Sequence, residues 1–211
     1  QKQLYLGKLY YTGHYGPYDG WEGKKNYTKS VEWYKLAAEQ GSREAISKLV
    51  SIYSQLLIES DVFHKSYLDI RDEDEWSQWF LWDERYKEAA KWCKLAAEQG
   101  TSNAQADLGD AYYEGKGVPQ NYKEAVKWWE KSRLREYSLG EAYRDGKGVV
   151  QNHVMAHMHF NVDASETSSY SIHPLLSEKA RNNLEKEMTP SQIEEAQQLA
   201  LEWVQSQDKK K

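Results

Sequence analysis

Small and apolar residues recur at helical spacing in short blocks along the chain. Ala104, Leu108 and Ala111 follow one another at intervals of four and three positions, which places them on one face of a helix. The next block repeats the arrangement with Ala125 and Trp128. A Gly-Lys-Gly-Val segment and a polar turn separate the two blocks. The pattern therefore predicts two amphipathic helices joined by a short turn.

This arrangement occurs several times, and internal repetition decides the fold. A Leu-Gly dipeptide followed three positions later by Tyr begins at Leu6, Leu108 and Leu139, with a degenerate copy at Leu49. The Trp of the second block lies 20 positions after Leu108, and the equivalent slot of the last copy holds His159. From each Trp to the next Leu is 16 positions in two copies, so a complete unit spans 36 residues.

Each repeat is predicted to form two antiparallel helices whose ends are marked by sequence signals. The first Gly of the Gly-Lys-Gly-Val segment is suited to positive φ and to capping the first helix. An Asn before the second block, as at Asn26 and Asn121, is a plausible N-cap of the second helix. A Gln-Gly pair at Gly41 and Gly100 predicts where the second helix ends.

These motifs resemble the Sel1-like repeat family, which is related to the tetratricopeptide repeats. Residues 103–132 match the family's pattern almost throughout, and the resemblance covers roughly residues 1–164. It implies an all-α fold, a right-handed α-solenoid of about four helix pairs, a bacterial source and a role in protein–protein contact without one fixed reaction. The predicted units are about 1–41, 42–100, 101–133 and 134–164.

Two insertions interrupt the repeats. Seven extra residues fall within a loop at positions 13–23 that is rich in Gly, Tyr and Trp, either a binding loop or a long turn that folds back on the repeats. Another 23 residues extend the second copy, where 56–84 predicts a continued helix, an acidic turn and a further helical piece. Trp76 and Trp79 share a helical face there, as a cover for the solenoid flank or as an aromatic anchor patch.

The end of the chain departs from the repeat in another way. Five residues are missing near 131–136, which predicts a tighter turn and a changed superhelical twist. Residues 165–211 begin with a polar linker and continue as two helices that would cap the apolar end of the solenoid. Thr189 starts the last helix as N-cap, with Gln192 at N3 of a capping box.

Composition removes several classes of protein. No apolar run is long enough to span a membrane, and mean hydropathy is -0.93. A net charge of -5 argues against a general nucleic-acid binder, and one cysteine forbids an intrachain disulfide. The chain starts at Gln1 without Met or a leader, and because the family is often exported we expect the periplasm rather than the cytoplasm. The oligomeric state stays open.

No constellation for chemistry is apparent, so we predict no catalytic residue, no cofactor and no metal. His153 and His157 share a helix face as a two-point ligand set without a fitting third ligand, and His159 reads as a buried substitute for Trp. Cys93 reads as a core residue rather than a reactive thiol. Paired cysteines mark the Sel1-like proteins linked to β-lactam chemistry, and this chain lacks them.

The functional hypothesis is therefore a non-enzymatic scaffold or adaptor that binds a partner protein through its concave face and its aromatic loop. One alternative is a bacterial immunity protein that neutralises a secreted toxin such as a phospholipase effector. The others are an enzyme of the cysteine-rich type and a structural or regulatory part of an envelope assembly. The predicted contact residues are Tyr11, Tyr15, Tyr18, Trp21, Trp76, Trp79, Tyr113, Glu114 and Arg144.

Overall fold

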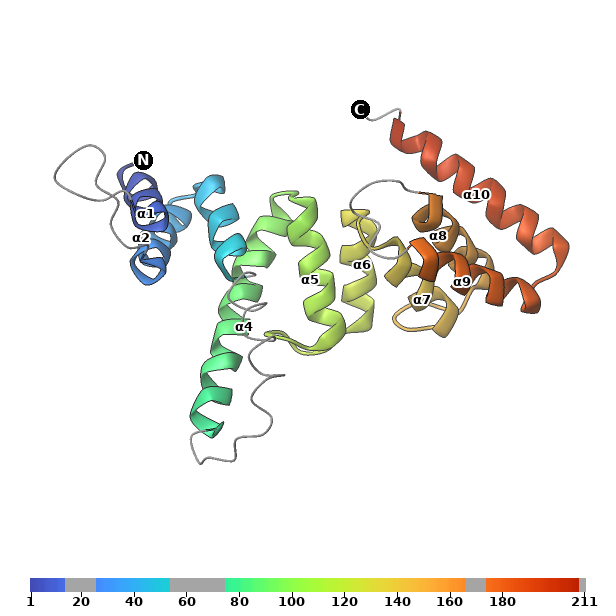
Figure 1. The fold of residues 1–211 in the computed structure, drawn as a ribbon, viewed down its shortest axis with the longest axis horizontal. Helices are drawn as coiled ribbons and strands as arrows, with labels where there is room; N and C mark the ends of the chain where they lie inside the picture. Colours follow the sequence, from blue (N-terminus) through green and yellow to red (C-terminus); the bar gives the residue numbers. More distant parts are fainter. Residues whose placement is uncertain (14–25, 54–74, 166–173, 209–211) are drawn as a thin grey trace. The chain divides into compact units, whose positions relative to one another are not determined.

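The computed structural model describes residues 1–13, 26–53, 75–165 and 174–208, and all regular structure in these ranges is helical (Figure 1). The helices are α1 (Lys2–Thr12), α2 (Tyr27–Glu39), residues 43–53, α4 (Glu75–Glu98), α5 (Ser102–Glu114), α6 (Tyr122–Ser132), α7 (Glu136–Asp145), α8 (His153–Ser165), α9 (Pro174–Leu184) and α10 (Pro190–Asp208), with a 3-10 turn at Glu185–Glu187. The all-α prediction is confirmed. None of the described helices is long and apolar enough to cross a bilayer.

The chain forms two compact units. Unit 1 comprises Gln1–Ala104 together with Lys116–Val118, and unit 2 comprises Gln105–Gly115 together with Pro119–Lys211. The repeat boundaries drawn from the sequence remain predictions.

Three of the helix pairs are locked by a ring that lies on a glycine. A Cβ atom added at Gly7 of α1 would lie 2.7 Å from the Tyr34 ring of α2. A Cβ at Gly109 would come closer still to Trp129, and one at Gly140 closer still to Phe160. The Leu-Gly dipeptide is therefore needed because the second helix places an aromatic ring where any side chain would stand.

The turn between the two helices of a pair is held by the same bonds in three of the copies. Asn26, Asn121 and Asn152 each accept a hydrogen bond through Oδ1 from the backbone N–H three residues later, at 3.0 to 3.1 Å. Their own N–H groups donate to the carbonyl of the repeat Tyr, at 2.8 to 2.9 Å. The N-cap prediction is confirmed. Each of these Asn side chains accepts from a backbone N–H group that has no partner within its own helix.

The second copy, in unit 1, replaces the glycine and the ring together. Val50 stands at the glycine position and Cys93 at the ring position, so the larger and the smaller side chain have exchanged sides. Cys93 is buried, as predicted for a core residue. Trp92 beside it is 2% exposed and donates its indole N–H to Glu88 at 2.9 Å. Glu88 also pairs with Lys35 of α2 at 2.8 Å.

Opposing influences act on the pKa values of this pair. For Glu88, burial raises the pKa, but the hydrogen bonds from Lys35 and Trp92 outweigh it and the pKa is lowered. For Lys35, burial lowers the pKa, but the hydrogen bonds to Glu88 and Tyr53 outweigh it and the pKa is raised. Both groups are therefore held in their charged forms.

The long insertion continues directly into the second helix of its pair. Because α4 is unbroken from Glu75 to Glu98, the further helical piece and the repeat helix are one helix. Residues 54–74 lie outside the described part of the chain, and so do the side chains of Trp76 and Trp79.

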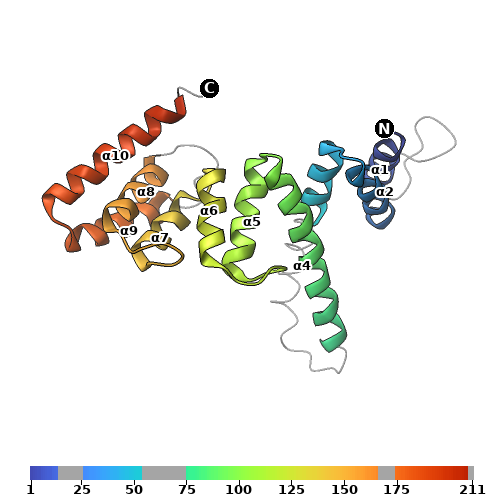
Figure 2. The same ribbon diagram turned by 180° about the vertical axis from the view of Figure 1, so that it is seen from behind.

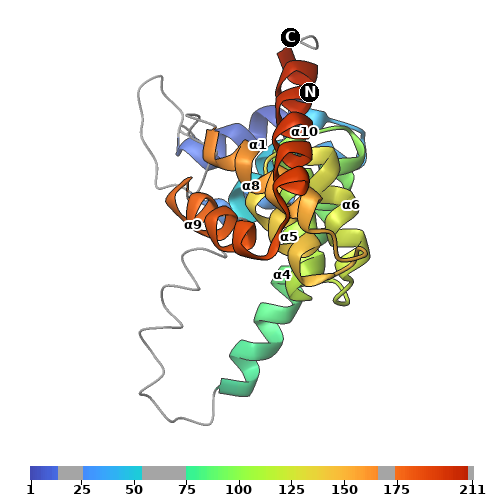
Figure 3. The same ribbon diagram turned by 90° about the vertical axis from the view of Figure 1, so that its right-hand side faces the viewer.

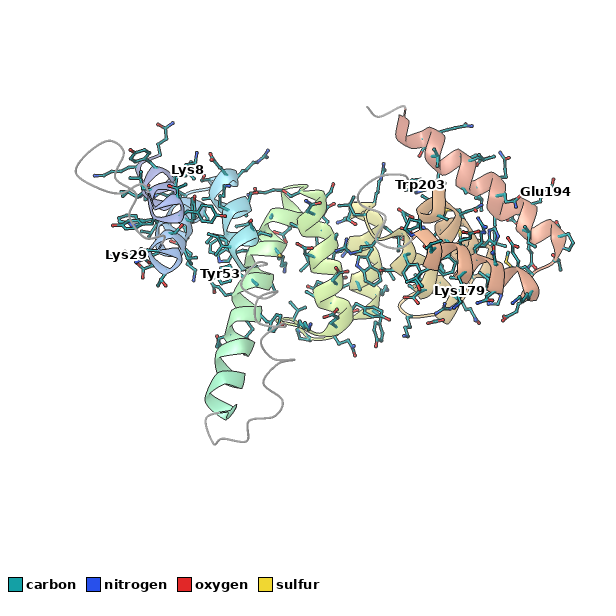
Figure 4. The ribbon with its side chains drawn as sticks, viewed as in Figure 1. Lys8, Lys29, Tyr53, Lys179, Glu194 and Trp203 are labelled. Atoms are coloured by element: carbon teal, nitrogen blue, oxygen red, sulfur yellow. The ribbon has the colours of Figure 1, made fainter. Side chains whose placement is uncertain are left out.

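The C-terminal helices pack on α8 inside unit 2 (Figures 2 and 3). Thr189 and Gln192 form the predicted capping box, with Oε1 of Gln192 accepting from the Thr189 N–H at 2.9 Å. Ala196 and Ala200 of α10 are buried in the core. Trp203 lies on the side of α10 that faces α8, whereas Glu194 points away (Figure 4). One face of α10 therefore packs on α8.

Candidate protein-binding groove

Unit 2 contains a groove of about 340 Å³ along the first helices of its two pairs. Residues of α5, α7 and the connector before α7 form most of its walls, and α6 and α8 contribute one residue each. The lining residues are Asp110, Tyr113, Glu114, Trp129, Leu134, Arg135, Tyr137, Ser138, Glu141 and Asp163. Three of these are aromatic, and the charged ones comprise four carboxylates and one guanidinium.

Asp110 and Arg135, which both line the groove, form an ion pair. Asp110 accepts the Trp129 indole N–H at 2.8 Å and lies 2.7 Å and 3.0 Å from Nη2 and Nε of Arg135. Arg135 also lies 3.7 Å from Asp107. Burial raises the pKa of Asp107, the positive charge of Arg135 acts against this, and the negative charge of Asp110 adds to it. This ion pair ties α5 to the connector before α7.

The Tyr113 side chain forms an aromatic wall of the groove. Its ring packs against Trp129 and Tyr122, with centroids 5.2 Å and 5.1 Å away. Lys147 Nζ lies 3.2 Å from its hydroxyl and over the ring. These neighbours hold Tyr113 in one orientation.

Glu141 of α7 is another carboxylate of the groove lining. Its Oε1 atom accepts from the Tyr137 hydroxyl at 3.3 Å and from Nη2 of Arg144 at 3.4 Å. Among the described residues, Oε2 has no hydrogen-bond partner. Burial raises the pKa of Tyr137, and the charge and hydrogen bond of Glu141 raise it further, so this hydroxyl stays protonated at neutral pH.

Asp163 of α8 is a buried carboxylate in the groove lining. Its side chain accepts a hydrogen bond of 2.5 Å from the Ser177 hydroxyl of α9. A second buried pair lies outside the lining, where His159 Nδ1 is 2.7 Å from Glu136 and the His159 ring stacks on Tyr143 at 5.4 Å. His159 thus fills the Trp slot as predicted, and Glu136 satisfies its polar atom.

The repeat pattern is matched by a family model as well as by the structure. The Sel1 repeat model matches residues 3–42, 83–101, 102–134 and 136–161, which is more than half of the chain. The chain belongs to the Sel1 repeat family. The groove lies on the two repeats matched at residues 102–134 and 136–161, which contain α5–α6 and α7–α8.

Solved structures share this Sel1-like repeat fold. The crystal structure of c5321, a protective antigen present in uropathogenic Escherichia coli strains, matches with a TM-score of 0.62 and 27% identity over 96% of this chain. This chain spans 37% of that antigen's length. A Sel1 repeat protein from Oxalobacter formigenes matches with a TM-score of 0.56 and 22% identity, over 93% of this chain and 72% of that one. No curated protein matches in sequence.

The contact residues predicted from the Sel1 pattern fall in different places. Tyr113 and Glu114 line the groove. Arg144 stands beside it, bonded to Asp145 at 2.7 Å, and lines a separate cleft of about 270 Å³ with His153. Tyr11 lies on α1 in unit 1, under Lys48 at 5.6 Å. Tyr15, Tyr18 and Trp21 lie outside the described residues. All of these assignments remain predictions.

Several groove residues were not foreseen from the sequence. Glu141 and Asp110 stand directly after the repeat Gly, three positions before Arg144 and Tyr113, and this spacing places them on the same helix face. This spacing could have identified Glu141 and Asp110 from the sequence. Asp163 gave no signal, because it comes from the second helix of its pair.

The histidines of α8 have protein partners. His157 is fully buried, and its Nε2 lies 2.9 Å from Glu185. Its Nδ1 has no partner in the described part of the chain. His153 Nε2 lies 3.3 Å from Gln151. Within the described ranges, no three His, Cys, Asp or Glu side chains are placed to hold a metal ion.

Proposed function

We propose that this Sel1 repeat protein is a non-enzymatic protein-binding module and that the groove of unit 2 is its contact face. The observation that carries the proposal is the groove itself, a solvent-open surface whose aromatic walls are fixed by neighbours and whose lining also presents four carboxylates and one guanidinium. Fixed aromatic side chains provide contact area at low entropic cost, which is typical of recognition surfaces.

The chemistry of the groove supports binding rather than catalysis. Asp110 is committed to Trp129 and Arg135, and Tyr137 keeps its proton because its pKa is raised. A general base needs an accessible group with a suitable pKa next to a reacting atom. The groups of the groove instead hold one another in place.

The test is capture of partner proteins from an extract of the source cells by the immobilised chain. Ser138 lines the groove on α7, so Ser138→Arg places a long side chain inside it. Gln197 is exposed on α10, and Gln197→Arg makes the same change in charge at a remote place. We expect the first variant to lose the partner and the second to keep it, with equal melting temperatures. Equal capture by both variants would refute the groove as the contact face.

The aromatic loop at residues 13–23 is proposed as a second contact. Because rigid aromatics such as Tyr18 and Trp21 supply contact area, replacing both by Ala should weaken partner binding with little change in melting temperature. Unchanged affinity would remove the loop from the proposal.

A second candidate function is that of an immunity protein. The groove carries more carboxylates than cations, which suits a partner with a basic active-site mouth, as some secreted toxins have. Under this hypothesis, cells that produce a toxin encoded beside this chain survive only when the chain is present. Survival with the Ser138→Arg variant would contradict a groove-based mechanism.

A further inference from the structure

We infer that Gly148, in the turn after α7, is a positioning residue that sets the spacing of the two walls of the groove. The inference rests on the proposed function and adds what holds the contact face in shape. A Cβ atom added at Gly148 would lie 2.8 Å from the backbone nitrogen of Lys123 and closer still to the Tyr122 carbonyl, at the start of α6. The turn therefore lies directly on the backbone of the neighbouring pair, and no side chain fits between them.

The same contact occurs once more, inside unit 1. Gly117 occupies the repeat position of Gly148, and a Cβ atom there would lie 2.8 Å from the backbone nitrogen of Lys87 and closer still to the Tyr86 carbonyl. Tyr86 and Tyr122 stand at equivalent positions of their repeats. Because the contact recurs at matching positions, it belongs to the repeat and not to one irregular turn.

The turn is attached to the end of α7 by its own bonds. The Asn152 N–H donates to the Tyr143 carbonyl at 2.9 Å, and the Gln151 side chain donates to the Arg144 carbonyl at 2.8 Å. Val149 packs against the core cluster to which both α6 and α7 contribute. A displacement of the turn from α6 is therefore passed to the end of α7.

The start of α7 is tied to the same neighbouring pair on the side of the groove. Arg135, the N-cap residue of α7, lies 2.7 Å from Asp110 of α5. The helix is thus held at both ends, by an ion pair at its start and by the Gly148 contact after its end. Because α5 and α7 supply most of the groove lining, the two contacts together set the distance between its walls.

Gly146 provides a matched control in the same turn. Both glycines have positive φ, 69° at Gly146 and 79° at Gly148, so alanine is strained at either position. The atoms nearest to a Cβ at Gly146 belong to Gln151, at 3.5 Å and beyond, which is ordinary contact. Gly146→Ala therefore measures backbone strain alone, whereas Gly148→Ala measures strain together with the contact on α6.

The first measurement is a distance between spin labels by pulsed electron paramagnetic resonance. The labels are placed with Lys127→Cys and Lys179→Cys, both at exposed positions of unit 2, in a Cys93→Ala background. Because a carbon atom needs about 3.5 Å from its neighbours, Gly148→Ala should shift the mean distance by about 1 Å or more, and Gly146→Ala should not. Arg135→Gln, which loosens the other end of α7, should shift it as well.

The second measurement is the affinity for the captured partner, well below the melting temperature of each variant. A glycine that only stabilises the fold would leave the affinity of the folded chain unchanged. We expect Gly148→Ala to weaken binding at least about tenfold and Gly146→Ala to leave it unchanged. Equal label distances in the native chain, Gly148→Ala and Arg135→Gln, or equal shifts in Gly146→Ala and Gly148→Ala, would overturn the inference.

Failure of this inference can be told apart from failure of the proposed function. If Ser138→Arg abolishes partner capture while Gly148→Ala changes neither the distance nor the affinity, the groove is the contact face and Gly148 does not position it. If Gly148→Ala shifts the distance but Ser138→Arg leaves capture intact, the proposed function itself is wrong.

Discussion

The two repeats of unit 2 share a skeleton and differ in their polar chemistry. In α5–α6 the ring of Trp129 lies on Gly109, and in α7–α8 the ring of Phe160 lies on Gly140. In both pairs a glutamine side chain also donates to a carbonyl near the end of the first helix, from Gln120 at 2.9 Å and from Gln151 at 2.8 Å. The repeat thus fixes the backbone twice by the same contacts.

This difference in polar chemistry begins at the indole nitrogen of Trp129, which Phe160 at the equivalent position lacks. Trp129 offers an indole N–H that Asp110 accepts, and Arg135 completes the coordination of that carboxylate. Phe160 has no polar atom, so Glu141, at the position equivalent to Asp110, has no such donor and accepts instead from the Tyr137 hydroxyl and Arg144. The two equivalent carboxylates therefore have different hydrogen-bond partners in the two repeats.

The largest expected effect comes from filling the glycine niche. Gly109→Ala or Gly140→Ala forces a methyl group into an aromatic ring and should cost roughly 2–3 kcal/mol of unfolding free energy. Denaturant unfolding measures it. Ser138→Ala, on the same helix as Gly140, should change stability by less than about 0.5 kcal/mol.

A second substitution shows whether the ring is the cause. Phe160→Leu makes room above Gly140, so the Gly140→Ala/Phe160→Leu double variant should be destabilised by less than the two single effects added together. Strict additivity would contradict the proposed contact.

Removing the indole nitrogen of Trp129 should make the pair α5–α6 resemble the pair α7–α8. Trp129→Phe deprives Asp110 of one donor and should cost about 1–2 kcal/mol, measured by thermal and denaturant unfolding. With Asp110→Asn already present, which weakens the same bond, the additional cost of Trp129→Phe should be smaller. An equal cost in both backgrounds would mean that packing alone matters.

The caps should matter equally in the two repeats. Asn121→Ala and Asn152→Ala each remove a side-chain acceptor at a helix start and should each cost about 1 kcal/mol. Asn→Asp at the same positions keeps an acceptor and should preserve most of the stability. A cost in only one repeat would show that the skeletons differ after all.

The smallest effect concerns the same niche in unit 1, where the ring carries a hydroxyl. Tyr34 is fully buried, and in the described residues its hydroxyl has no partner. Tyr34→Phe removes a polar group that is buried without a hydrogen bond, so it should raise stability at neutral pH by less than about 1 kcal/mol. A loss of stability would contradict the orphaned hydroxyl.

The same variant tests a pH dependence. Burial, followed by the charges of Glu44 and Tyr11, raises the pKa of Tyr34 from 10.0 to about 12. Between pH 10 and pH 12 the Tyr34 hydroxyl of the unfolded chain releases a proton that the folded chain keeps. The contribution of this pKa shift to the free energy of unfolding is therefore complete below pH 10 and is lost as pH rises towards 12. Urea unfolding from pH 9 to 12 should show a smaller alkaline loss for Tyr34→Phe than for the native chain.

The skeleton was predictable because it depends on local signals at fixed spacing. The repeat glycines, the cap at Asn121 and the capping box at Thr189 each satisfy backbone or packing needs within a few residues. Tyr113 and Glu114 were predicted by their place on the first helix. Glu141 was missed although its spacing to Arg144 was visible in the sequence. Asp163 could not be predicted, because it comes from the second helix of its pair and reaches the groove only through the packing of the folded helices.

The position of the repeat Trp shows a similar limit of prediction from the sequence. Trp128 is buried and Trp33 only half-buried, while the ring one position later, Tyr34 or Trp129, lies on the glycine. The sequence identifies both positions as apolar, but which of the two enters the niche depends on how the helices rotate against each other.

The most direct test of the central claim is hydrogen–deuterium exchange of the chain alone and bound to its captured partner. If the groove is the contact face, partner binding slows exchange in the C-terminal half of α5 and in residues 134–141, and leaves α10 unchanged. Protection confined to α6 or α10, with the groove residues exchanging as in the free chain, would contradict the account.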